Sequence, residues 1–361
     1  MSKIRILLFC VATLFATQGC EKITDTVIFP PTTDLVDTIQ PLTVMTYNVY
    51  VGSSTDDLLS VDSLLEVPTE VAKIYHNAIA SDFLARAVAI ATHIETHHPH
   101  LIGLQEISVV RRQSPGDLIS GGTVLAENVE MDYLHILLDA IHAVGLQYQV
   151  AAKVENFDVE MPMFTETGID DIRLTDYDVI LARHDVETAD ATAATYDAAF
   201  RVDLLGLDVK RGYVGVDATV DGNTYRFVNT HLGSYSEDAR IVQTQELINS
   251  LADETLPIIL LGDFNTPAPD GTAYQMLRTA GYIDLYQADP HGNGNTCCLA
   301  PDLRNETSAL SERIDLIFLC HPQGEVSAIT HTVGDKAEDR LPNRNLWPSD
   351  HAGVVAEITF Q

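Results

Sequence analysis

Four polar segments, far apart in the chain, each lie beside an apolar run and carry metal ligands or proton-transfer groups. They are Leu-Gln-Glu at 104–106, Asn-Thr-His-Leu at 229–232, Gly-Asp-Phe-Asn at 262–265 and Ser-Asp-His at 349–351. Short apolar runs bounded in this way predict buried strands, and functional side chains gather where loops leave a rigid sheet. The chain is therefore predicted to bring these strand ends together at one site of metal-assisted hydrolysis.

Apolar periodicity divides the chain after residue 41 into helical and extended segments. Helices are predicted over 70–98, 130–144 and 237–253. Strands are predicted over 42–49, 101–107, 146–153, 177–183, 213–220, 225–231, 257–261, 313–319 and 353–360. The Asp-Gly-Asn sequence at 221–223 should form a hairpin turn. Helices and strands alternate early and strands pair late, which favours a mixed two-sheet sandwich flanked by helices.

Residues 1–19 have the pattern of an export signal. Lys3 and Arg5 precede an apolar run over 6–16 that is too short to span a bilayer. The following Gly19-Cys20 resembles the lipobox of bacterial lipoproteins, in which the cysteine is lipidated and becomes the new N-terminus. The chain is thus predicted to have a signal peptide over 1–19, a lipid-anchor cysteine with a polar tether over 20–41 and a folded domain over 42–361, with plain secretion as the alternative.

Acidic residues greatly outnumber basic ones. The formal charge is −31 at pH 7 with His neutral, and loss of Lys3 and Arg5 with the signal would give −31 − 2 = −33. An acidic surface repels polyphosphates and gives up the counterion release that drives most nucleic-acid binding. Nucleic acid is therefore disfavoured as a partner, and a small phosphoester or a lipid headgroup is favoured. We expect an exported monomer that touches a membrane only through its lipid anchor.

Two side chains at strand ends are candidate metal ligands. Glu106 ends a predicted buried strand, where an ionised carboxylate is costly unless a cation or hydrogen bonds offset it. Asn48 has the same place at the end of the first strand. Together they form the sparse oxygen set that Mg²⁺ prefers, which leaves positions for water and a substrate phosphate oxygen. In isolation, either residue could instead cap a turn.

Five further residues could handle protons or phosphate. Asp263 and Asn265 lie on one side of an extended segment, so one could orient a water molecule while the other holds a phosphoryl oxygen. His231 ends a strand and His351 precedes the last one, and such a pair can act as base and acid or donate to developing charge. Asp315 lies inside an apolar strand and needs a buried partner, which a histidine would supply. Taken singly, an Asx turn or a merely hydrogen-bonded histidine explains these residues as well.

In chain order, six motifs resemble those of the endonuclease/exonuclease/phosphatase superfamily, which includes pancreatic-type DNases, abasic-site endonucleases, neutral sphingomyelinases and inositol-polyphosphate phosphatases. The motifs are Thr-Tyr-Asn-Val at 46–49, Leu-Gln-Glu at 104–106, Asn-Thr-His-Leu at 229–232, Gly-Asp-Phe-Asn at 262–265, Arg-Ile-Asp-Leu-Ile at 313–317 and Ser-Asp-His at 349–351. The resemblance extends from Leu42 to the C-terminus. It implies an α/β fold, a single-domain, four-layered α/β/β/α sandwich with Mg²⁺ or Mn²⁺ at one end.

Carried over position by position, the resemblance implies a role for each oxygen ligand. Asn48, Glu106 and Asp350 would be at the metal. Asp263 and Asn265 would handle the attacking water and the phosphate. The assignment rests on the matching motifs and not on the strand pattern.

The resemblance also implies roles for the two histidines. His231 would contact a phosphate oxygen or the leaving group. His351, oriented by Asp315, would be the base or would stabilise the transition state, and which histidine acts as acid or base stays open. In DNase-like members the histidine at the place of His231 has a carboxylate partner, which the sequence does not identify here.

The primary hypothesis is an exported, divalent-metal-dependent phosphoesterase in which water attacks phosphorus in line, without a covalent enzyme intermediate. A Mg²⁺-dependent endonuclease or exonuclease is the alternative, because a locally basic groove can offset the global charge. A non-catalytic surface-binding lipoprotein is less favoured, since every expected catalytic group is present.

The cysteines and the sole tryptophan fall outside the six motifs. Cys297, Cys298 and Cys320 would remain in the exported chain. A bridge from the adjacent pair to Cys320, three buried thiols, or a zinc site with His321 are all open. Trp347, just before the Ser-Asp-His segment, is predicted to anchor a packed loop, with a lip over the substrate as the alternative.

Overall fold

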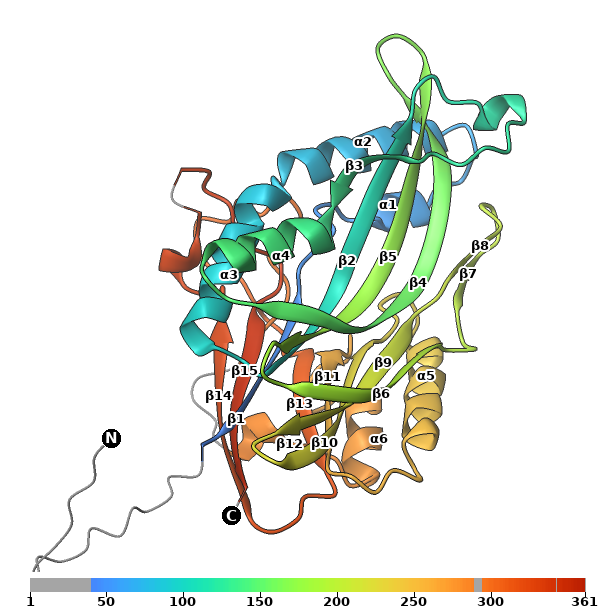
Figure 1. Ribbon diagram of the computed structural model, residues 1–361. Coiled ribbons are helices and arrows are strands. Elements are labelled where there is room, and N and C mark those ends of the chain that lie inside the picture. The colour runs from blue at the N-terminus through green and yellow to red at the C-terminus, as the bar shows by residue number, and fades with distance from the viewer. Residues whose placement is uncertain (1–39, 289–293, 342, 361) are drawn as a thin grey trace, which may run out of the picture. The chain divides into compact units, whose positions relative to one another are not determined.

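The computed structural model describes residues 40–288, 294–341 and 343–360, which fold around two β-sheets (Figure 1). The predicted signal peptide and nearly all of the predicted tether lie outside these residues. Among the described helices, none has the length and apolar character needed to cross a membrane.

The α-helices of the described residues are α1 (Asp56–Leu59), α2 (Val67–Ala80), α3 (Phe83–His97), α4 (Tyr133–Ala143), α5 (Glu237–Ser250) and α6 (Thr272–Thr279). The strands are β1 (Leu42–Asn48), β2 (Leu101–Gln113), β3 (Asn128–Asp132), β4 (Tyr148–Phe164), β5 (Ile169–Arg183), β6 (Glu187–Thr195), β7 (Phe200–Val202), β8 (Leu207–Val209), β9 (Gly212–Val220), β10 (Asn223–His231), β11 (Ile258–Asp263), β12 (Ile283–Asp284), β13 (Asp315–Cys320), β14 (Val326–Val333) and β15 (Gly353–Phe360).

Each large sheet has one parallel pair near its centre and antiparallel neighbours around it. The first sheet has the order β14-β15-β1-β2-β5-β4, with β3 paired to β2, and the second has the order β12-β13-β11-β10-β9-β6. The parallel pairs are β1 with β2 and β10 with β11. Strands β7 and β8 form a separate hairpin.

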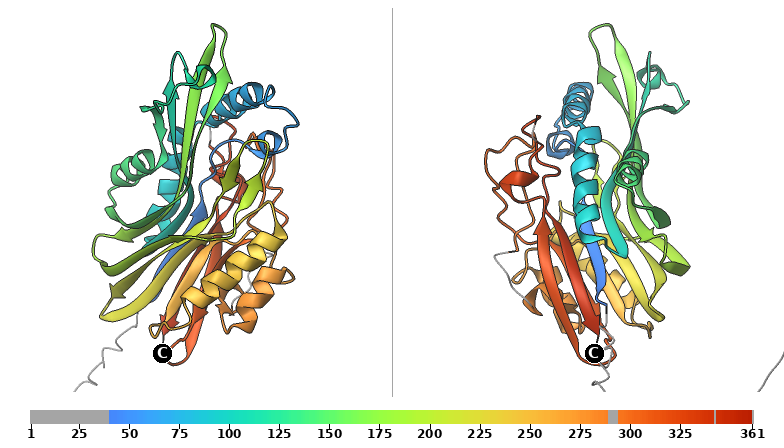
Figure 2. Two further views of the ribbon diagram at one scale, coloured as in Figure 1. Left: turned by 90° about the vertical axis from the view of Figure 1, so that its right-hand side faces the viewer. Right: turned by 60° about the vertical axis from the view of Figure 1, so that its left-hand side comes forward.

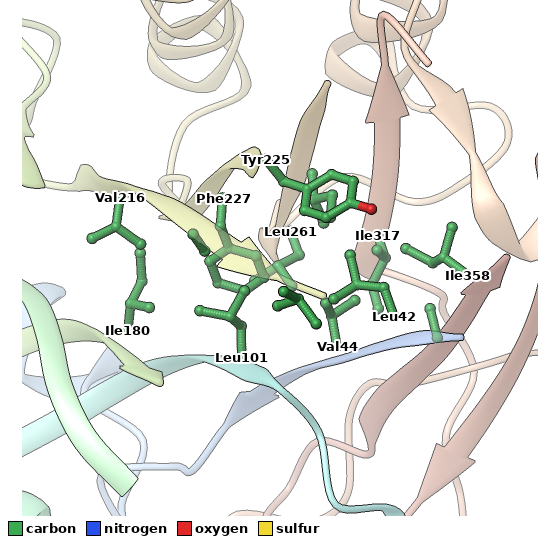
Figure 3. Close-up of a cluster of buried hydrophobic side chains, with 14 of the residues drawn as sticks. Leu42, Val44, Leu101, Ile180, Val216, Tyr225, Phe227, Leu261, Ile317 and Ile358 are labelled. Atoms are coloured by element: carbon green, nitrogen blue, oxygen red, sulfur yellow. The ribbon is translucent and has the colours of Figure 1, made fainter. Parts of the chain in front are cut away.

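Side chains along the central strands alternate between two cores, and this alternation builds four layers. Val44 and Leu101 pack between the sheets against residues such as Leu261 (Figure 3). Their neighbours Met45 and Ile102 face the other way and pack with α3 and α4. On the outer face of the second sheet, β11 packs with α5 and α6. The two sheets and their covering helices (Figure 2) confirm the predicted α/β/β/α sandwich in a single domain.

A buried amide joins the two sheets near the strand ends that carry the polar motifs. Asn229 on β10 donates from Nδ2 to the backbone oxygens of Leu104 at 3.0 Å and Val179 at 3.1 Å in the first sheet. Its Oδ1 accepts a hydrogen bond of 2.6 Å from Gln105 Nε2. These contacts satisfy every group that Asn229 buries, so they fix how the two sheets are placed relative to each other.

The helix predicted over 70–98 is wrong as a single element, because α2 and α3 break at Ser81 and Asp82. Asp82 has φ of 51°, and its carboxylate accepts a hydrogen bond of 3.3 Å from the backbone N of Ala85, which caps α3. Ile79, two residues before the break, is 44% exposed. The helical spacing of apolar residues continues across the break, so periodicity alone does not reveal it.

Other boundaries shift for reasons of local capping and of pairing with distant strands. Helix α4 begins at Tyr133 and not at Glu130, because Asp132 caps it by accepting from His135 N at 3.1 Å. Strand β2 runs on to Gln113 through polar residues that pair with β5 and β3. The hairpin turn at 221–223 is confirmed, since β9 and β10 pair directly across it. The pattern did not predict α1, α6, β3, β6, β7, β8, β12 or β14.

Candidate active site

A cavity of about 340 Å³ lies where the predicted motifs meet. Six of the eight predicted site residues line it, and these are Glu106, His231, Asp263, Asn265, Asp350 and His351. The other two lie directly behind it. Asn48 is hydrogen-bonded to Glu106 and Asp263, and Asp315 is hydrogen-bonded to His351. The structure therefore brings all eight residues together.

Glu106 reaches the cavity from a β-bulge inside β2. The pairing of β2 with β5 shifts between Leu104 and Ile107, and Glu106 has φ of 59°. The prediction that Glu106 ends a strand is therefore wrong, although its place at the site holds. The bulge lets Gln105 turn to the other sheet while Glu106 lines the cavity, where Oε2 accepts a hydrogen bond of 2.7 Å from Val51 N.

Asn48 connects two carboxylates from different sheets. Its Nδ2 donates to Glu106 Oε1 at 3.1 Å and to Asp263 Oδ2 at 3.0 Å, while Oδ1 accepts from the backbone N of Tyr50 at 3.0 Å. In this arrangement Asn48 positions the carboxylates. Binding a cation through its oxygen, as predicted, would require the amide group to turn over.

Gly262 allows close packing of two strands and does not form a turn. It lies within β11, opposite Thr230 of β10, with φ of 144°. A Cβ at this position would overlap the backbone oxygen of Thr230. The strand therefore continues straight into Asp263, and glycine is required because no other residue fits beside β10.

The acidic residues of the cavity fit a hard divalent cation. Burial raises the pKa of Asp350 to about 7, and the charges of Glu106 and Asp263 act in the same direction, against His351 and Arg86. A cation bound between Glu106 and Asp350 would remove this repulsion and restore the ionised form. Carboxylate oxygens are the ligands that Mg²⁺ and Mn²⁺ prefer.

His351 and Asp315 form a close buried pair. His351 Nδ1 lies 2.8 Å from Asp315 Oδ2, within hydrogen-bonding distance. Burial disfavours the charged imidazole, but the carboxylates of Asp315 and Asp350 outweigh it and raise the pKa of His351 well above its ordinary value. Asp315 thus fixes the ring so that Nε2 faces the cavity side, at 3.9 Å from Asp263 Oδ2.

His231 has a carboxylate partner that the sequence analysis missed, Asp178 on β5. His231 Nδ1 lies 3.8 Å from Asp178 Oδ1, and both residues are buried. Burial and Arg211 lower the pKa of His231, yet Asp178 and Asp263 outweigh them and raise it. The available signal was the pair of acids Asp176 and Asp178, two apart, at the start of the apolar run 179–182.

Asp263 lies between the two imidazoles. Its Oδ2 is 3.6 Å from His231 Nε2 and 3.9 Å from His351 Nε2, and its Oδ1 accepts from Asn265 N at 2.9 Å. Ligand atoms of Asp263, Asp315 and His351 lie within 4.8 Å of one another. Because the Asp315–His351 contact already occupies two of these atoms, we interpret this cluster as a proton-transfer group and not as the metal site.

Two buried contacts fix the loop that carries Asp350 and His351. Ser349 Oγ donates to the backbone oxygen of Asn48 at 2.7 Å. The fully buried Arg86 of α3 donates to the backbone oxygens of Val49 at 2.6 Å, Tyr50 at 2.9 Å and Pro348 at 3.0 Å. The end of β1 and the last motif are therefore held together.

Trp347 packs beneath the same loop. It is fully buried, and its Nε1 donates to the backbone oxygen of Asn305 at 3.0 Å. This confirms the prediction of a loop anchor and not a lip over the substrate.

The cysteines adopt none of the arrangements left open above. Cys297 and Cys298 are bonded to each other, and Cys320 is a buried free thiol on β13. Cys298 lines the active-site cavity. The adjacent Leu299 N donates to the backbone oxygen of Asp350 at 2.9 Å, so the disulfide segment borders the last motif.

Comparison with known proteins agrees with this geometry. The sequence profile of the Endonuclease/Exonuclease/phosphatase family matches residues 45–351, which span all six motifs. The chain belongs to this family. It is therefore a hydrolase of phosphoric esters in a family that depends on a divalent metal.

Solved structures with the same fold are distant in sequence. A mannosyl-6-phosphatase from Bacteroides thetaiotaomicron is 18% identical, with a TM-score of 0.54 over 88% of this chain and 100% of that one. A family member from Bacteroides vulgatus is 17% identical, with a TM-score of 0.52 over 89% and 99%. A humanized D. rerio TDP2 is 15% identical, with a TM-score of 0.53 over 88% and 98%. No curated protein sequence matches at a significant level.

Proposed function

We propose that this chain is an exported, Mg²⁺- or Mn²⁺-dependent phosphoesterase that hydrolyses a phosphodiester or phosphomonoester by direct in-line attack of water. The observation that carries the proposal is the position of Asp263, whose Oδ2 lies 3.6 Å and 3.9 Å from the Nε2 atoms of two buried histidines. A carboxylate between two imidazoles, beside an acidic cation site, provides a proton acceptor and two donors around one phosphorus atom.

Each residue then has a separate task. Asp263 orients the water and accepts its proton. His231 and His351 donate hydrogen bonds to the phosphate oxygens and to the leaving oxygen, and Asn265 holds the phosphate with an amide that already donates to Leu232 O at 2.9 Å. When bound at Glu106 and Asp350, the metal supplies Lewis-acid neutralisation of the charge on the phosphate.

The substrate is best sought among small phosphoesters and lipid headgroups. The formal charge of −31 works against binding a long polyanion, and Arg211 is the one Lys or Arg side chain among the residues that line the cavity. The distant neighbour called a mannosyl-6-phosphatase supports phosphomonoesters as candidates. A nuclease is the alternative, and a locally basic groove would be needed for it.

Export and anchoring form part of the same proposal and rest on the sequence. We propose that residues 1–19 are removed and that Cys20 carries the lipid. Metabolic labelling with a fatty acid, lost in Cys20→Ala, tests the anchor. Release of unlabelled, soluble wild-type protein would show plain secretion.

The activity is tested with a chromogenic phosphodiester in the presence of Mg²⁺ or Mn²⁺. Turnover should be abolished by EDTA, by Asp263→Ala and by His351→Ala. The matched controls Asp270→Ala and His135→Ala change exposed residues and should keep wild-type turnover. A panel of plasmid DNA, sphingomyelin, nucleotides and inositol phosphates then ranks substrates. If no phosphoester is turned over with metal present, the proposal fails, and a preference for DNA would favour the nuclease.

A further inference from the structure

The active-site cavity has a second, apolar side that the proposed chemistry does not use. Besides the acidic and histidine side chains, the lining includes apolar residues from β4, β5 and β8. These apolar residues are Phe157, Val159, Met161, Leu174, Leu207 and Val209. Hydrolysis of a phosphate group alone requires no such wall, because phosphate and metal interact with charged and polar groups.

The apolar wall continues out of the cavity into a surface groove of about 610 Å³. Val159, Met161 and Leu207 line both the cavity and the groove. Strand β4 and the β7–β8 hairpin therefore form one apolar surface that begins beside the catalytic groups.

Large exposed apolar side chains border the outer part of this groove. Leu65 is 86% exposed, Leu64 and Ile119 are each 59% exposed, and Phe164 is 47% exposed. The one charged residue in the groove lining is Glu160, whose carboxylate accepts a hydrogen bond of 2.6 Å from Ala126 N. In a chain as acidic as this one, such a weakly charged and exposed apolar strip is unexpected unless it has a ligand.

The groove's position defines what it can bind. It is continuous with the cavity, so a molecule whose phosphorus atom reaches Asp263 has room to direct its remaining atoms along the apolar wall. From Phe157 to Met161 the wall on β4 covers four residue steps, or ~13 Å at ~3.3 Å per residue. This is the length of an extended alkyl or acyl chain and not of a sugar ring or a single base.

We propose that this groove binds the apolar chain of an amphiphilic phosphoester, whose phosphate group lies at the catalytic residues. The inference rests on the proposed phosphoesterase function and specifies its substrate class. The chain of the substrate buries Val159, Met161 and Leu207, and the phosphate reaches Asp263 and the two histidines. Burial of each additional methylene should favour binding, until the chain passes the end of the wall.

The first test compares chromogenic phosphodiesters that carry a butyl or a dodecyl chain, both below their critical micelle concentrations. Since burying one methylene changes an equilibrium by up to about fourfold, kcat/KM should be at least about 100-fold higher for the dodecyl ester. The double variant Val159→Thr/Leu207→Asn should lower the dodecyl value about 10-fold and leave the butyl value within about twofold. Val150→Thr is the matched control, because Val150 lies on the same strand, is 42% exposed and lines neither hollow.

A binding measurement separates this inference from the proposed activity. Asp263→Asn protein is titrated calorimetrically with butyl and dodecyl phosphonates in the presence of Mg²⁺, and the longer ligand should bind at least about 100-fold more tightly. If the dodecyl ligand binds tightly but the wild-type protein turns over no ester, the proposed phosphoesterase activity is refuted and the proposed role of the groove stands. Equal affinities for the butyl and dodecyl phosphonates would overturn the proposed role of the groove. A preference for the dodecyl ligand that the double variant leaves unchanged would overturn it as well. The protein could also bind phosphatidylcholine vesicles through the groove and show no preference for the monomeric dodecyl ligand. That result would make the groove a membrane-binding surface and would overturn the proposal that it binds the chain of the substrate.

Discussion

The active site has two histidine–carboxylate pairs, and they differ in the distance between the histidine and its carboxylate. In one pair the histidine belongs to the second sheet and the aspartate to the first, and in the other pair the aspartate belongs to the second sheet and the histidine precedes a strand of the first. In the pair of His351 and Asp315, Nδ1 and Oδ2 are 2.8 Å apart. In the pair of His231 and Asp178, Nδ1 and Oδ1 are 3.8 Å apart, and neither atom has another hydrogen-bond partner. Only the first pair makes a hydrogen bond.

The difference follows from the elements that carry the histidines. His231 lies in β10, whose pairing with β9 and β11 fixes its backbone, and Asp178 is fixed in β5. His351 lies in the loop before β15, outside any strand pairing, and the contacts of Ser349 and Arg86 hold this loop where the His351 ring meets Asp315 of β13. A histidine on a loop can therefore lie within hydrogen-bonding distance of its carboxylate. When both residues lie in strands, the spacing of the two packed sheets sets the distance between them.

Asp263 lies close to the histidine of each pair, so its replacement should have the largest effect on activity. Asp263→Asn should lower kcat on a chromogenic phosphodiester by at least about 1,000-fold, because it removes the proposed proton acceptor and the charge that faces both imidazoles. Thermal unfolding of the variant checks that it is folded. Activity within tenfold of wild type would mean that the two pairs act without a shared carboxylate.

Loss of the close pair should come next. Asp315→Asn should lower kcat by about 100-fold to 1,000-fold, because the imidazole loses the charge that orients and stabilises it. The double variant Asp315→Asn/His351→Asn should be no worse than His351→Asn, since residues that act as a unit are not additive. Additive losses would show that Asp315 acts apart from His351.

Loss of the open pair should have a smaller effect. Asp178→Asn should lower kcat by less than about tenfold, because at 3.8 Å it removes a charge but no hydrogen bond. Asn156, which donates to both Asp178 and Asp176 at 2.9 Å, keeps an acceptor in the variant. If Asp178→Asn lowers kcat as much as Asp315→Asn does, bound substrate brings His231 and Asp178 within hydrogen-bonding distance. The difference between the two pairs would then exist only in the enzyme without substrate.

The smallest effect concerns Asp350, which adjoins the close pair. Its folded pKa of about 7 lies above the ordinary 3.8, so between about pH 4 and pH 7 the unfolded chain releases a proton that the folded chain retains. Stability of the metal-free protein should therefore fall as pH rises through this range. Added Mn²⁺ should raise Tm by about 2 °C more at pH 8 than at pH 5. The difference should survive in Asp178→Asn and disappear in Asp350→Asn, and an equal rise at both pH values would contradict it.

Residue chemistry and strand periodicity predict much of this molecule, because ligands at strand ends and alternating apolar runs are local properties. Asn48, Glu106 and His351 could be chosen in this way, and the sandwich follows from the same pattern. The bulge at Glu106 depends on how β2 pairs with β5, which no local pattern specifies. Asp178 was missed because its partner lies on the other sheet, and Arg86 because a basic residue inside a helix is typical of a solvent-facing position.

Arg86 also has a consequence for the resting charge of the active site. Its buried guanidinium donates to carbonyl oxygens and to Ser81, and among the described residues no carboxylate forms an ion pair with it. A permanent positive charge therefore lies behind the acidic cluster, and it lowers the pKa of Asp350 against the effect of burial. This internal counter-charge offsets part of the repulsion among the carboxylates of the active site. The protein can assemble its catalytic geometry before a cation arrives, and the cation it then takes up should be exchangeable and not a permanent structural component.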